Sequence, residues 1–345
     1  MKGIRSSLYN SIKDLIEESK SKIVRNVNSI IVHTHFEIGR IIVEHEQKGK
    51  QRAVYAEKTL VQLSADLTAE YGSGYSRSNL EYMRKFYLLY KHRISQPATT
   101  KSSTKKSQPV VGKLGNSLQL SWSHYIQLLR IESENERNFY EIEAIQNNWG
   151  KRELLRQFNS SLYERIALSR DKKKVKELGK KGQIIEKPID ALKHYTVLEF
   201  LDLKEDESYS ESDLENAIIS RLEHFMMELG KGFLFEARQK RITLEMDSYY
   251  VDLVFYNRLL RCYILLDLKI GKLTHEDIGQ MQMYVNYYDR KIKLPEENST
   301  IGIILCKEES KAVVEFTLPN GNKTIFAKEY KLYLPSKNEL RKQLE

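Results

Sequence analysis

Apolar residues recur every three or four positions along the first half of the chain, which is the spacing of one face of a helix. This pattern predicts a long amphipathic helix from about Tyr9 to Glu46 and a second helix from about Tyr55 to Tyr71. Ser76 is a residue type that caps helix N-termini, so a third helix is expected to follow it. The first part of the chain is therefore predicted to be helical.

Two helix–turn–helix outlines lie in this helical half. The first turns at residues 71–74, with the sequence YGSG, and the second lies in residues 118–169 and turns at residues 147–150. An ordinary helical hairpin with a solvated basic face explains the same pattern, and on the pattern alone that interpretation is favoured. The residues that would face DNA in a true reader are Arg77, Asn79, Arg84 and Lys85 in the first outline and Lys151 and Arg152 in the second.

The pattern changes from about Val197 onward, where strand-like runs alternate with helical ones. Ser212-Asp213-Leu214-Glu215 is interpreted as a capping box that opens a helix, and Gly230 ends that helix. Thr274 is expected to cap a second helix. The order of elements predicts a mixed sheet flanked by helices. The runs expected to form its strands are GFLFEARQKRITLE, YYVDLVFY, RCYILLDLKI, STIGIILCKE and YKLYLP.

Two segments of biased composition divide the chain. Residues 91–113 are rich in Ser, Thr, Pro and Lys and contain no acid, which predicts a flexible basic linker. A charged connector follows the second helical segment. The expected parts are a helical, DNA-binding domain at 1–90, the linker at 91–113, a continuation of the helical domain at 114–170, the connector at 171–195 and an α/β domain at 196–345.

Composition limits the classes of protein to consider. The 345 residues include 56 Lys and Arg against 47 Asp and Glu, a formal net charge of +9 that favours a polyanionic partner. Cys262 and Cys306 lie in apolar runs, so we expect reduced core cysteines in a cytoplasmic protein. No signal peptide and no apolar run of about 20 residues is seen, so no membrane partner is expected. Without HExxH or CxxC motifs, a structural zinc site is not expected.

Three polar residues interrupt two of the apolar strands. Asp267 and Lys269 are two apart, so they share one face of their strand. In the preceding strand Val251 and Leu253 are expected to pack on one face, which leaves Asp252 on the other. If the strands are antiparallel neighbours, both acids and the lysine project together. Carboxylate pairs of this kind suit Mg²⁺ or Mn²⁺, and the lysine would orient or deprotonate an attacking water.

This spacing is weak by itself, but longer stretches carry a resemblance. LENAIISRLEHFMMELGKGFLFEARQKRI, YVDLVFYNRLLRCYILLDLKIGKL and EDIGQMQMYVNYYD resemble the PD-(D/E)XK nuclease superfamily, and more closely the YhcG family of bacterial PDDEXK-domain proteins. LSADLTAEYGSGYSRSNLEYMRKFYLLY resembles that family's helical domain. The resemblance implies an α+β multidomain protein. Its helical N-terminal half would bind DNA, and its C-terminal domain would have a restriction-endonuclease-like fold.

The resemblance also implies roles for single residues. Asp252 matches the superfamily's first acid, and Asp267 and Lys269 match its (D/E)XK pair, with Asp where Glu is common. Gln280 and Tyr284 match a Q-x3-Y pattern found in some branches, and would touch the sugar-phosphate or orient the lysine, unless they only pack on the sheet.

Superfamily members often add a glutamate from the first core helix as a metal ligand. Glu215 is the candidate, although its place in the expected capping box explains it without metal. Glu223 and Glu228 are rivals on the same helix. Basic and polar residues on the strand before Asp252 that could meet phosphate are Arg238, Gln239 and Arg241.

These observations favour a Mg²⁺-dependent DNA phosphodiesterase, with Mn²⁺ as an alternative ion, acting in DNA defence, restriction or recombination. A homo-oligomer is expected because cutting two strands needs two sites or two events, and defence-system proteins are candidate partners. The alternative is a DNA-binding or assembly module that retains the nuclease fold with weak or conditional cleavage. An RNA-acting nuclease is a third interpretation, which no aromatic RNA-recognition pattern supports.

Overall fold

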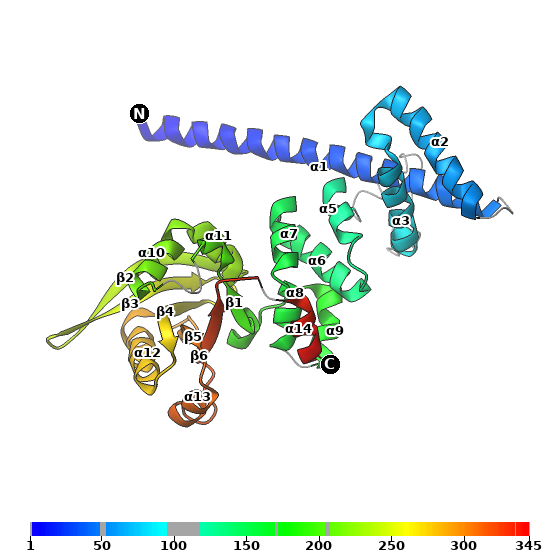
Figure 1. Ribbon diagram of the computed structural model, residues 1–345. Helices are drawn as coiled ribbons and strands as arrows, with labels where there is room; N and C mark the ends of the chain where they lie inside the picture. Colours follow the sequence, from blue (N-terminus) through cyan, green and yellow to red (C-terminus); the bar gives the residue numbers. More distant parts are fainter. Residues whose placement is uncertain are drawn as a thin grey trace, which may run out of the picture. The chain divides into compact units, whose positions relative to one another are not determined.

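The computed structural model describes residues 2–48, 53–94, 118–169, 172–203, 208–334 and 336–344 (Figure 1). Contacts divide the chain into two compact units, residues 1–154 and residues 155–345. The division falls within the helix Lys151–Asn159, whereas the sequence placed residues 114–170 with the helical domain. Most of the predicted basic linker lies outside the described residues.

The first unit is helical, as its periodicity predicts. Its first helix, α1, runs from Lys2 to Lys48 and is longer at both ends than expected. A short 3₁₀ turn separates the next two helices, which reproduces the first predicted helix–turn–helix outline. The remaining elements are α2 (Ala53–Tyr71), η1 (Ser73–Tyr75), α3 (Arg77–Ile94), α5 (Trp122–Leu128), α6 (Glu134–Gln146) and the start of α7 (Lys151–Asn159).

Close packing between α1 and α3 forms the centre of this unit. A Cβ atom on Gly39 would overlap the carbonyl oxygen of Met83, so only glycine allows the two backbones to approach this closely. Phe36 packs edge-on against Phe86, with ring centroids 6.0 Å apart. Trp122 packs against the same cluster, with its ring centroid 5.4 Å from that of Phe86.

The second unit is built on a six-stranded mixed sheet with the order β1-β6-β5-β4-β3-β2. The antiparallel ribbon β2-β3-β4 and the crossover to a parallel β5 confirm the predicted mixed sheet. The last strand was misplaced, because YKLYLP was expected and the strand observed is IFAKEYK; β1 was not anticipated. The strands are β1 (Tyr195–Val197), β2 (Phe233–Leu244), β3 (Asp247–Asn257), β4 (Cys262–Lys272), β5 (Ile301–Glu308) and β6 (Ile325–Lys331).

Helices cover both faces of the sheet (Figure 1). Two helices from one chain segment, α10 (Glu211–Ser220) and α11 (Leu222–Leu229), bury Leu214 and Phe225 on one face. The crossover helix α12 (His275–Tyr287) buries its apolar side on the other face. The other helical elements are α8 (Leu162–Leu168), α9 (Lys172–Lys181), η2 (Pro188–Ala191), η3 (Glu199–Leu201), η4 (Tyr288–Ile292), α13 (Lys311–Thr317) and α14 (Lys337–Leu344).

The N-terminal caps of α10 and α12 test the two capping predictions made from the sequence. Thr274 caps α12 with Asp277 as its reciprocal partner, as predicted for Thr274. The box on α10 is formed by Ser210 and Asp213, and the prediction of a box between Ser212 and Glu215 was wrong. Helix capping therefore does not explain Glu215.

The sequence also predicts buried cysteines and no membrane-spanning helix. Cys262 and Cys306 are free and buried, as predicted, and burial raises the pKa of each thiol to about 12. Among the helices that the structure describes, none is both long and apolar enough to cross a bilayer.

Candidate active site

The candidate acids lie where β3 and β4 part from each other. Backbone pairing between the strands runs from Asn257 and Cys262 up to Leu253 and Leu266. One position further on, Oδ2 of Asp252 accepts a hydrogen bond from the backbone amide of Leu268 over 2.8 Å. A side-chain carboxylate thus takes the place of the next strand partner and leaves the two strands separated.

This separation also breaks the alternation of side chains along β3. Val251 packs in the cluster beneath α12, whereas Leu253 packs in the cluster beneath α10 and α11. The expectation that these two residues share a face was therefore wrong, because the strand does not keep a regular pleat at Asp252. The structure still brings Asp252 beside Asp267, as the antiparallel pairing of the strands predicts.

Asp267 is the more buried of the two acids. Its side chain is 4% exposed, and burial together with the charge of Asp252 raises its pKa to about 7, against the opposing effect of Lys269. Its Oδ2 atom lies 3.0 Å from the Lys269 ammonium but accepts no hydrogen bond of good geometry from the described residues. A buried carboxylate oxygen with spare acceptor capacity faces a like-charged neighbour here.

The ammonium of Lys269 has three carboxylates around it. Its Nζ atom lies 3.0 Å from Asp267, 3.6 Å from Glu211 and 3.9 Å from Asp277. Burial alone lowers the pKa of Lys269, but these negative charges, led by that of Asp267, raise it above its ordinary value. Lys269 is therefore held as a protonated cation.

Glu211 and Asp277 were missed at the level of sequence. Both lie in the first turn of a helix, Glu211 in α10 and Asp277 in α12, where acidic residues are explained by the helix dipole. Only the tertiary packing of both helices beside β4 shows that these first turns meet at Lys269. An acid in the first turn of each flanking helix is the one sequence feature that could have identified them.

Glu215 is buried, at 4% exposure, and is linked to Asp252 through Gln239. The amide nitrogen of Gln239 lies 2.6 Å from Glu215 Oε2 and 2.9 Å from Asp252 Oδ1, so it bridges an acid of α10 and an acid of β3. Arg238 forms an ion pair with Glu215 and also donates to Asn216 over 2.7 Å. Arg238 and Gln239 thus hold the acids in place.

Arg241, the third polar residue predicted on β2, lies further along the hairpin. Its Nε atom donates to Ser248 Oγ across the ribbon over 3.0 Å, and its side chain is exposed. Arg241 therefore braces the hairpin and leaves part of its guanidinium open to solvent.

Gln280 and Tyr284 contact each other and the backbone of β3. Gln280 donates to the Tyr284 hydroxyl over 2.6 Å, and that hydroxyl donates to the carbonyl of Tyr250 over 2.9 Å. Burial and the charge of Asp267 raise the pKa of Tyr284 to about 12. This pair fixes β3 to α12 just beyond the acids, and within the described chain neither side chain has a hydrogen bond to Lys269.

The donor set fits a divalent ion in part. The carboxylates of Asp252 and Asp267 supply the hard oxygen ligands that Mg²⁺ and Mn²⁺ prefer, and the spare oxygen of Asp267 is available. Across the described ranges, however, no three His, Cys, Asp or Glu side chains form a group that could hold an ion. Glu215, predicted as a third ligand, is separated from Asp252 by Gln239.

Glu223 and Glu228, the other two candidates for a third metal ligand, lie on α11. Glu223 is exposed on α11. Glu228 is buried and paired with Arg165 at 2.5 Å, and its Oε1 also accepts from the backbone amide of Val197. Neither is placed to join Asp252 and Asp267.

Most of the predicted DNA-reading residues of α3 are engaged within the helical unit. The indole of Trp122 donates to Asn79 over 2.8 Å, so Asn79 joins α3 to α5. The guanidinium groups of Arg77 and Arg84 pair with Glu81 and Glu46, at 3.0 Å and 2.7 Å. Arg77 is exposed despite its ion pair, and the other exposed basic residues of the predicted set in the helical unit are Lys85, Lys151 and Arg152.

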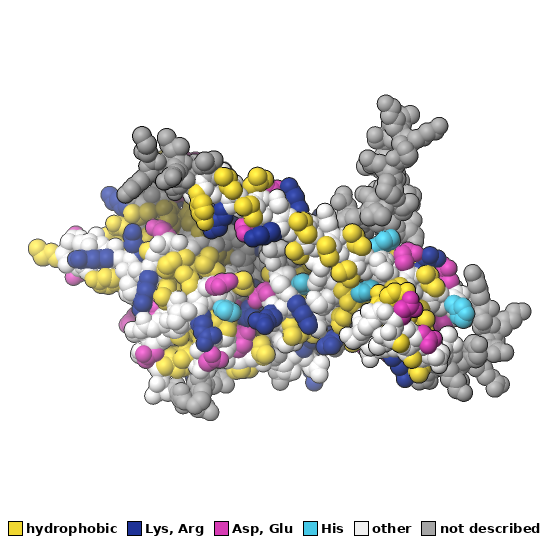
Figure 2. Space-filling view, turned by 90° about the horizontal axis from the view of Figure 1, so that it is seen from above, with side chains coloured by type: hydrophobic (Ala, Val, Ile, Leu, Met, Phe, Trp, Pro, Cys, Tyr) yellow, Lys and Arg dark blue, Asp and Glu magenta, His cyan; other side chains and the backbone are white. Residues whose placement is uncertain are grey.

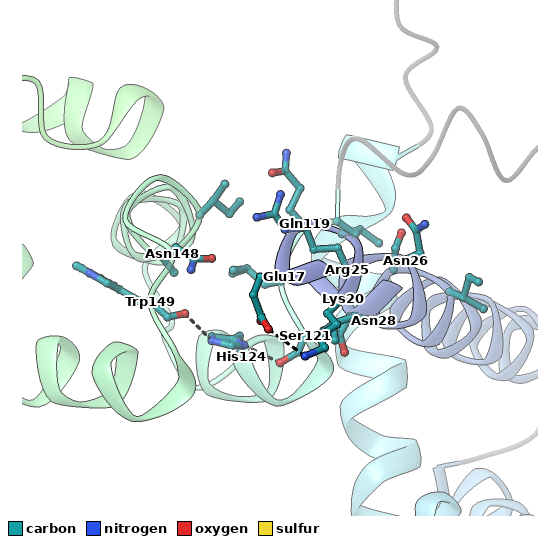
Figure 3. A pocket seen from close by; sticks show the side chains of 17 residues that line it. Glu17, Lys20, Arg25, Asn26, Asn28, Gln119, Ser121, His124, Asn148 and Trp149 are labelled. Atoms are coloured by element: carbon teal, nitrogen blue, oxygen red, sulfur yellow. Dashed lines mark hydrogen bonds and ion pairs between the residues drawn. The ribbon is translucent and has the colours of Figure 1, made fainter. Parts of the chain in front are cut away.

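The helical unit also contains a cleft of about 1280 Å³ between α1 and the segment of α5 and α6 (Figure 3). His124 is fixed on one wall by Ser121 Oγ at 2.6 Å and by the carbonyl of Trp149 at 3.1 Å. Glu17, the one carboxylate among the described residues that line the cleft, pairs with Lys20 at 2.9 Å. The cleft is polar but offers no paired acids from these residues, so the candidate catalytic groups are those of the sheet.

Comparison with known proteins finds two family matches and a similar protein. Residues 189–345 match the family described as YhcG PDDEXK nuclease domain, and residues 11–165 match the DUF1016 N-terminal domain. An Escherichia coli (strain K12) protein, described as "Putative nuclease YhcG", is 38% identical over 352 residues, covering 98% of this chain and 92% of that protein.

Two solved structures share a more distant likeness. One is a repair endonuclease from Pyrococcus abyssi, 19% identical over 38% of this chain and 50% of that chain, with a TM-score of 0.25. The other is EndoMS in complex with double-stranded DNA, 16% identical over 39% of this chain and 51% of that chain, also with a TM-score of 0.25. Scores of this size carry no functional weight.

Proposed function

Because this chain belongs to the YhcG family of PDDEXK nuclease-domain proteins, we propose that it hydrolyses phosphodiester bonds of DNA with a bound divalent metal ion. The observation that carries the proposal is the meeting of Asp252, Asp267 and Lys269 at the point where β3 and β4 separate. Mg²⁺ is the proposed ion, and Mn²⁺ would fit the same oxygen ligands.

Asp252 and Asp267 would hold the ion, which in such sites polarises the phosphate and lowers the pKa of a bound water. Gln239 and the Leu268 amide orient the Asp252 carboxylate from two directions. The raised pKa of Lys269 argues that this side chain orients water and offsets negative charge on the phosphate, and that it does not remove a proton.

The helical unit would grip the DNA backbone. The net charge of +9 and the exposed positions of Lys85, Lys151 and Arg152 support phosphate contacts that carry no sequence preference. Action on both strands would need two catalytic domains or two successive events. A pair of chains, with defence, restriction or recombination proteins as partners, is the assembly we propose for such work.

One observation favours a second candidate, a DNA-binding module with conditional cleavage. Both oxygens of Asp252 already accept hydrogen bonds within the protein, and Gln239 lies between Asp252 and Glu215. A third carboxylate could then join the ion only after Gln239 moves, so DNA or a partner would have to trigger the active arrangement.

A cleavage panel tests the proposal. The full chain would be incubated with supercoiled plasmid, linear duplex and single-stranded DNA in Mg²⁺, in Mn²⁺ and in EDTA, with Asp267→Asn as the disabled control. Cleavage of at least one DNA form that needs metal and is lost in Asp267→Asn is expected. Cleavage that persists in EDTA or in Asp267→Asn would reject this site, and DNA binding without cleavage in any arm would favour the conditional module.

A further inference from the structure

A line of exposed apolar side chains runs along α1, and the catalytic proposal makes no use of it. Figure 2, which looks onto this helix, shows hydrophobic side chains gathered along it. We refer to these residues as the α1 stripe. They are Tyr9, Ile12, Ile16, Ile23, Val27, Ile30 and Ile41, and their exposures are 67%, 49%, 48%, 62%, 48%, 56% and 58%.

The stripe runs straight along the helix, and three further exposed apolar residues, Leu15, Val24 and Ile31, lie about 70° to 90° to either side of its centre. At about 100° per residue, its seven members fall within a sector of about 60° on the helix surface. Their span from Tyr9 to Ile41 corresponds to about 48 Å along the axis. Four of them, Tyr9, Ile16, Ile23 and Ile30, are spaced seven residues apart, which is the repeat of a helix that pairs with another helix.

The opposite side of α1 is the one used within the helical unit. Val32, Phe36 and Val43 are at most 4% exposed and lie about 140° to 180° around the helix from the centre of the stripe. On that side Gly39 lets α1 approach α3 closely. The helix therefore has two apolar faces in opposite directions, and packing against α3 accounts for only one of them.

Water is a poor environment for the second face. Described side chains from Tyr9 to Val27 are exposed all around the helix, so no packing within the described unit supports this part of α1. Helices in proteins owe most of their stability to the packing of an apolar face. Contiguous exposed apolar surface of this kind marks an interaction site.

We propose that the stripe is covered by the α1 stripe of a second copy of this chain, so that the protein is a dimer joined through α1. A straight row of mostly β-branched residues, four of whose members are seven residues apart, is self-complementary, which an isologous contact between two copies requires. Seven half-exposed side chains contribute on the order of 500 Å² per helix. Together with the flanking polar atoms, two helices approach the roughly 1,200 Å² of a stable interface.

The dimer does not depend on the proposed nuclease activity, because it rests only on the pattern and exposure of α1. It would nevertheless bring two nuclease domains into one particle. The test below measures mass and crosslinking, so its result is independent of whether any DNA is cut.

Light scattering coupled to gel filtration tests the interface on the full chain. Wild type is expected at twice the chain mass of 40.5 kDa, and Ile23→Glu at 40.5 kDa. Asn10→Glu is the matched control, because it places the same charge on the same exposed helix about 120° from the stripe, and it should remain dimeric. Circular dichroism would confirm that all three proteins keep their helix content.

A cysteine variant keeps the test decisive if Ile23→Glu does not fold. Both native cysteines are buried, so Ile23→Cys adds one accessible thiol. Oxidised glutathione should link this variant into a covalent dimer but should not link Asn10→Cys. The proposal is overturned by a monomeric wild type, by a dimer that Ile23→Glu leaves intact, or by equal crosslinking of the two cysteine variants. A monomeric wild type that Ile23→Glu destabilises would instead show that the chain covers its own stripe.

Discussion

Gln239 donates a hydrogen bond to Oδ1 of Asp252 over 2.9 Å, and this contact joins the first strand of the hairpin to the first acid of the candidate site. The same amide nitrogen lies 2.6 Å from Glu215, so one side chain determines the distance between two acids. Gln239 adopts a φ of 46°, a left-handed conformation that is uncommon for a residue with a side chain. This strained backbone conformation occurs at the residue whose side-chain amide lies between Glu215 and Asp252.

Gln239→Ala should lower metal-dependent cleavage by about 10- to 100-fold, the usual cost of removing a residue that orients a metal ligand. Asp252 would keep its hydrogen bond from Leu268 but lose the second hydrogen bond that fixes its rotation. The measurement is the initial rate of DNA cleavage as a function of Mn²⁺ concentration. Thr243→Ala, a change on the same strand beyond the site, serves as the control. A rate that matches this control would show that Asp252 does not need Gln239.

The raised pKa of Asp267 predicts a pH dependence for metal binding. Metal competes with a proton for Asp267 below about pH 7, so the rise in melting temperature caused by Mn²⁺ should be larger at pH 8 than at pH 5.5. Without metal the sign is opposite. A carboxyl whose pKa is raised by folding stabilises the fold at low pH, and this contribution is lost as pH rises through about 7.

Thermal unfolding at the two pH values, with Mn²⁺ and with EDTA, measures both effects. Asp267→Asn should remove the Mn²⁺-dependent rise at pH 8 and flatten the metal-free dependence on pH. A rise in melting temperature of equal size at both pH values would contradict the role given to Asp267.

The buried pair of Arg165 and Glu228 predicts a large effect on stability. Both side chains are fully buried, and Glu228 also accepts from the backbone of Val197 and lies 3.5 Å from the Lys193 ammonium. Burial alone would raise the pKa of Glu228, but the surrounding cations bring it below its ordinary value. Glu228→Gln leaves buried positive charge without compensation, which costs about 3–5 kcal/mol.

Urea unfolding of the full chain followed by circular dichroism would measure this loss. Glu223→Gln, at an exposed position on the same helix, should change the free energy of unfolding by no more than about 0.5 kcal/mol. Equal values for the two variants would mean that the charge cluster does not stabilise the unit.

Lys85, Lys151 and Arg152 are proposed to contact DNA phosphates, so they should contribute to the dependence of DNA affinity on salt concentration. Replacing Lys85, Lys151 and Arg152 with Ala is expected to weaken binding of every DNA sequence alike. In a plot of the logarithm of the binding constant against the logarithm of salt concentration, the magnitude of the slope should fall by about one for each phosphate that the variant no longer neutralises. Fluorescence anisotropy with the Asp267→Asn background, which prevents cleavage, measures this. An unchanged slope would remove these residues from the DNA interface.

The sequence suggests Asp252, Asp267 and Lys269 as candidates, but it does not predict the surrounding residues and strand geometry that hold them in place. Asp267 and Lys269 alternate with apolar residues on one strand, so periodicity places them on one face, and the resemblance of longer stretches to the PD-(D/E)XK superfamily made them candidates. The irregularity at Asp252 depends on how β3 leaves β4, and no feature of the YVDLVFY segment predicts it. The three carboxylates at Lys269 come from three separate elements, which only tertiary packing brings together.

Two errors have plain physical reasons. The segment SESDLE contains two overlapping serine–acid pairs with the spacing of a capping box, Ser210 with Asp213 and Ser212 with Glu215, and the helix begins early enough to use the first. The strand Ile325–Lys331 was missed because three charged residues interrupt it, whereas YKLYLP has more apolar positions. Pairing along both edges of β6 stabilises the strand against that composition.

Asp252, Asp267 and Lys269 are proposed to form a hydrolytic site where β3 and β4 separate. Two lysines of β4, Lys269 and Lys272, allow this proposal to be tested directly. Lys272 is 61% exposed and pairs with Glu308 at 3.2 Å, away from the acids of the site, so Lys272→Ala is a matched control for Lys269→Ala. The measurement is the rate of metal-dependent DNA cleavage by these two variants and wild type. The rate should fall by about 100-fold or more in Lys269→Ala and stay near that of wild type in Lys272→Ala. Equal rates for the two variants would contradict the proposal.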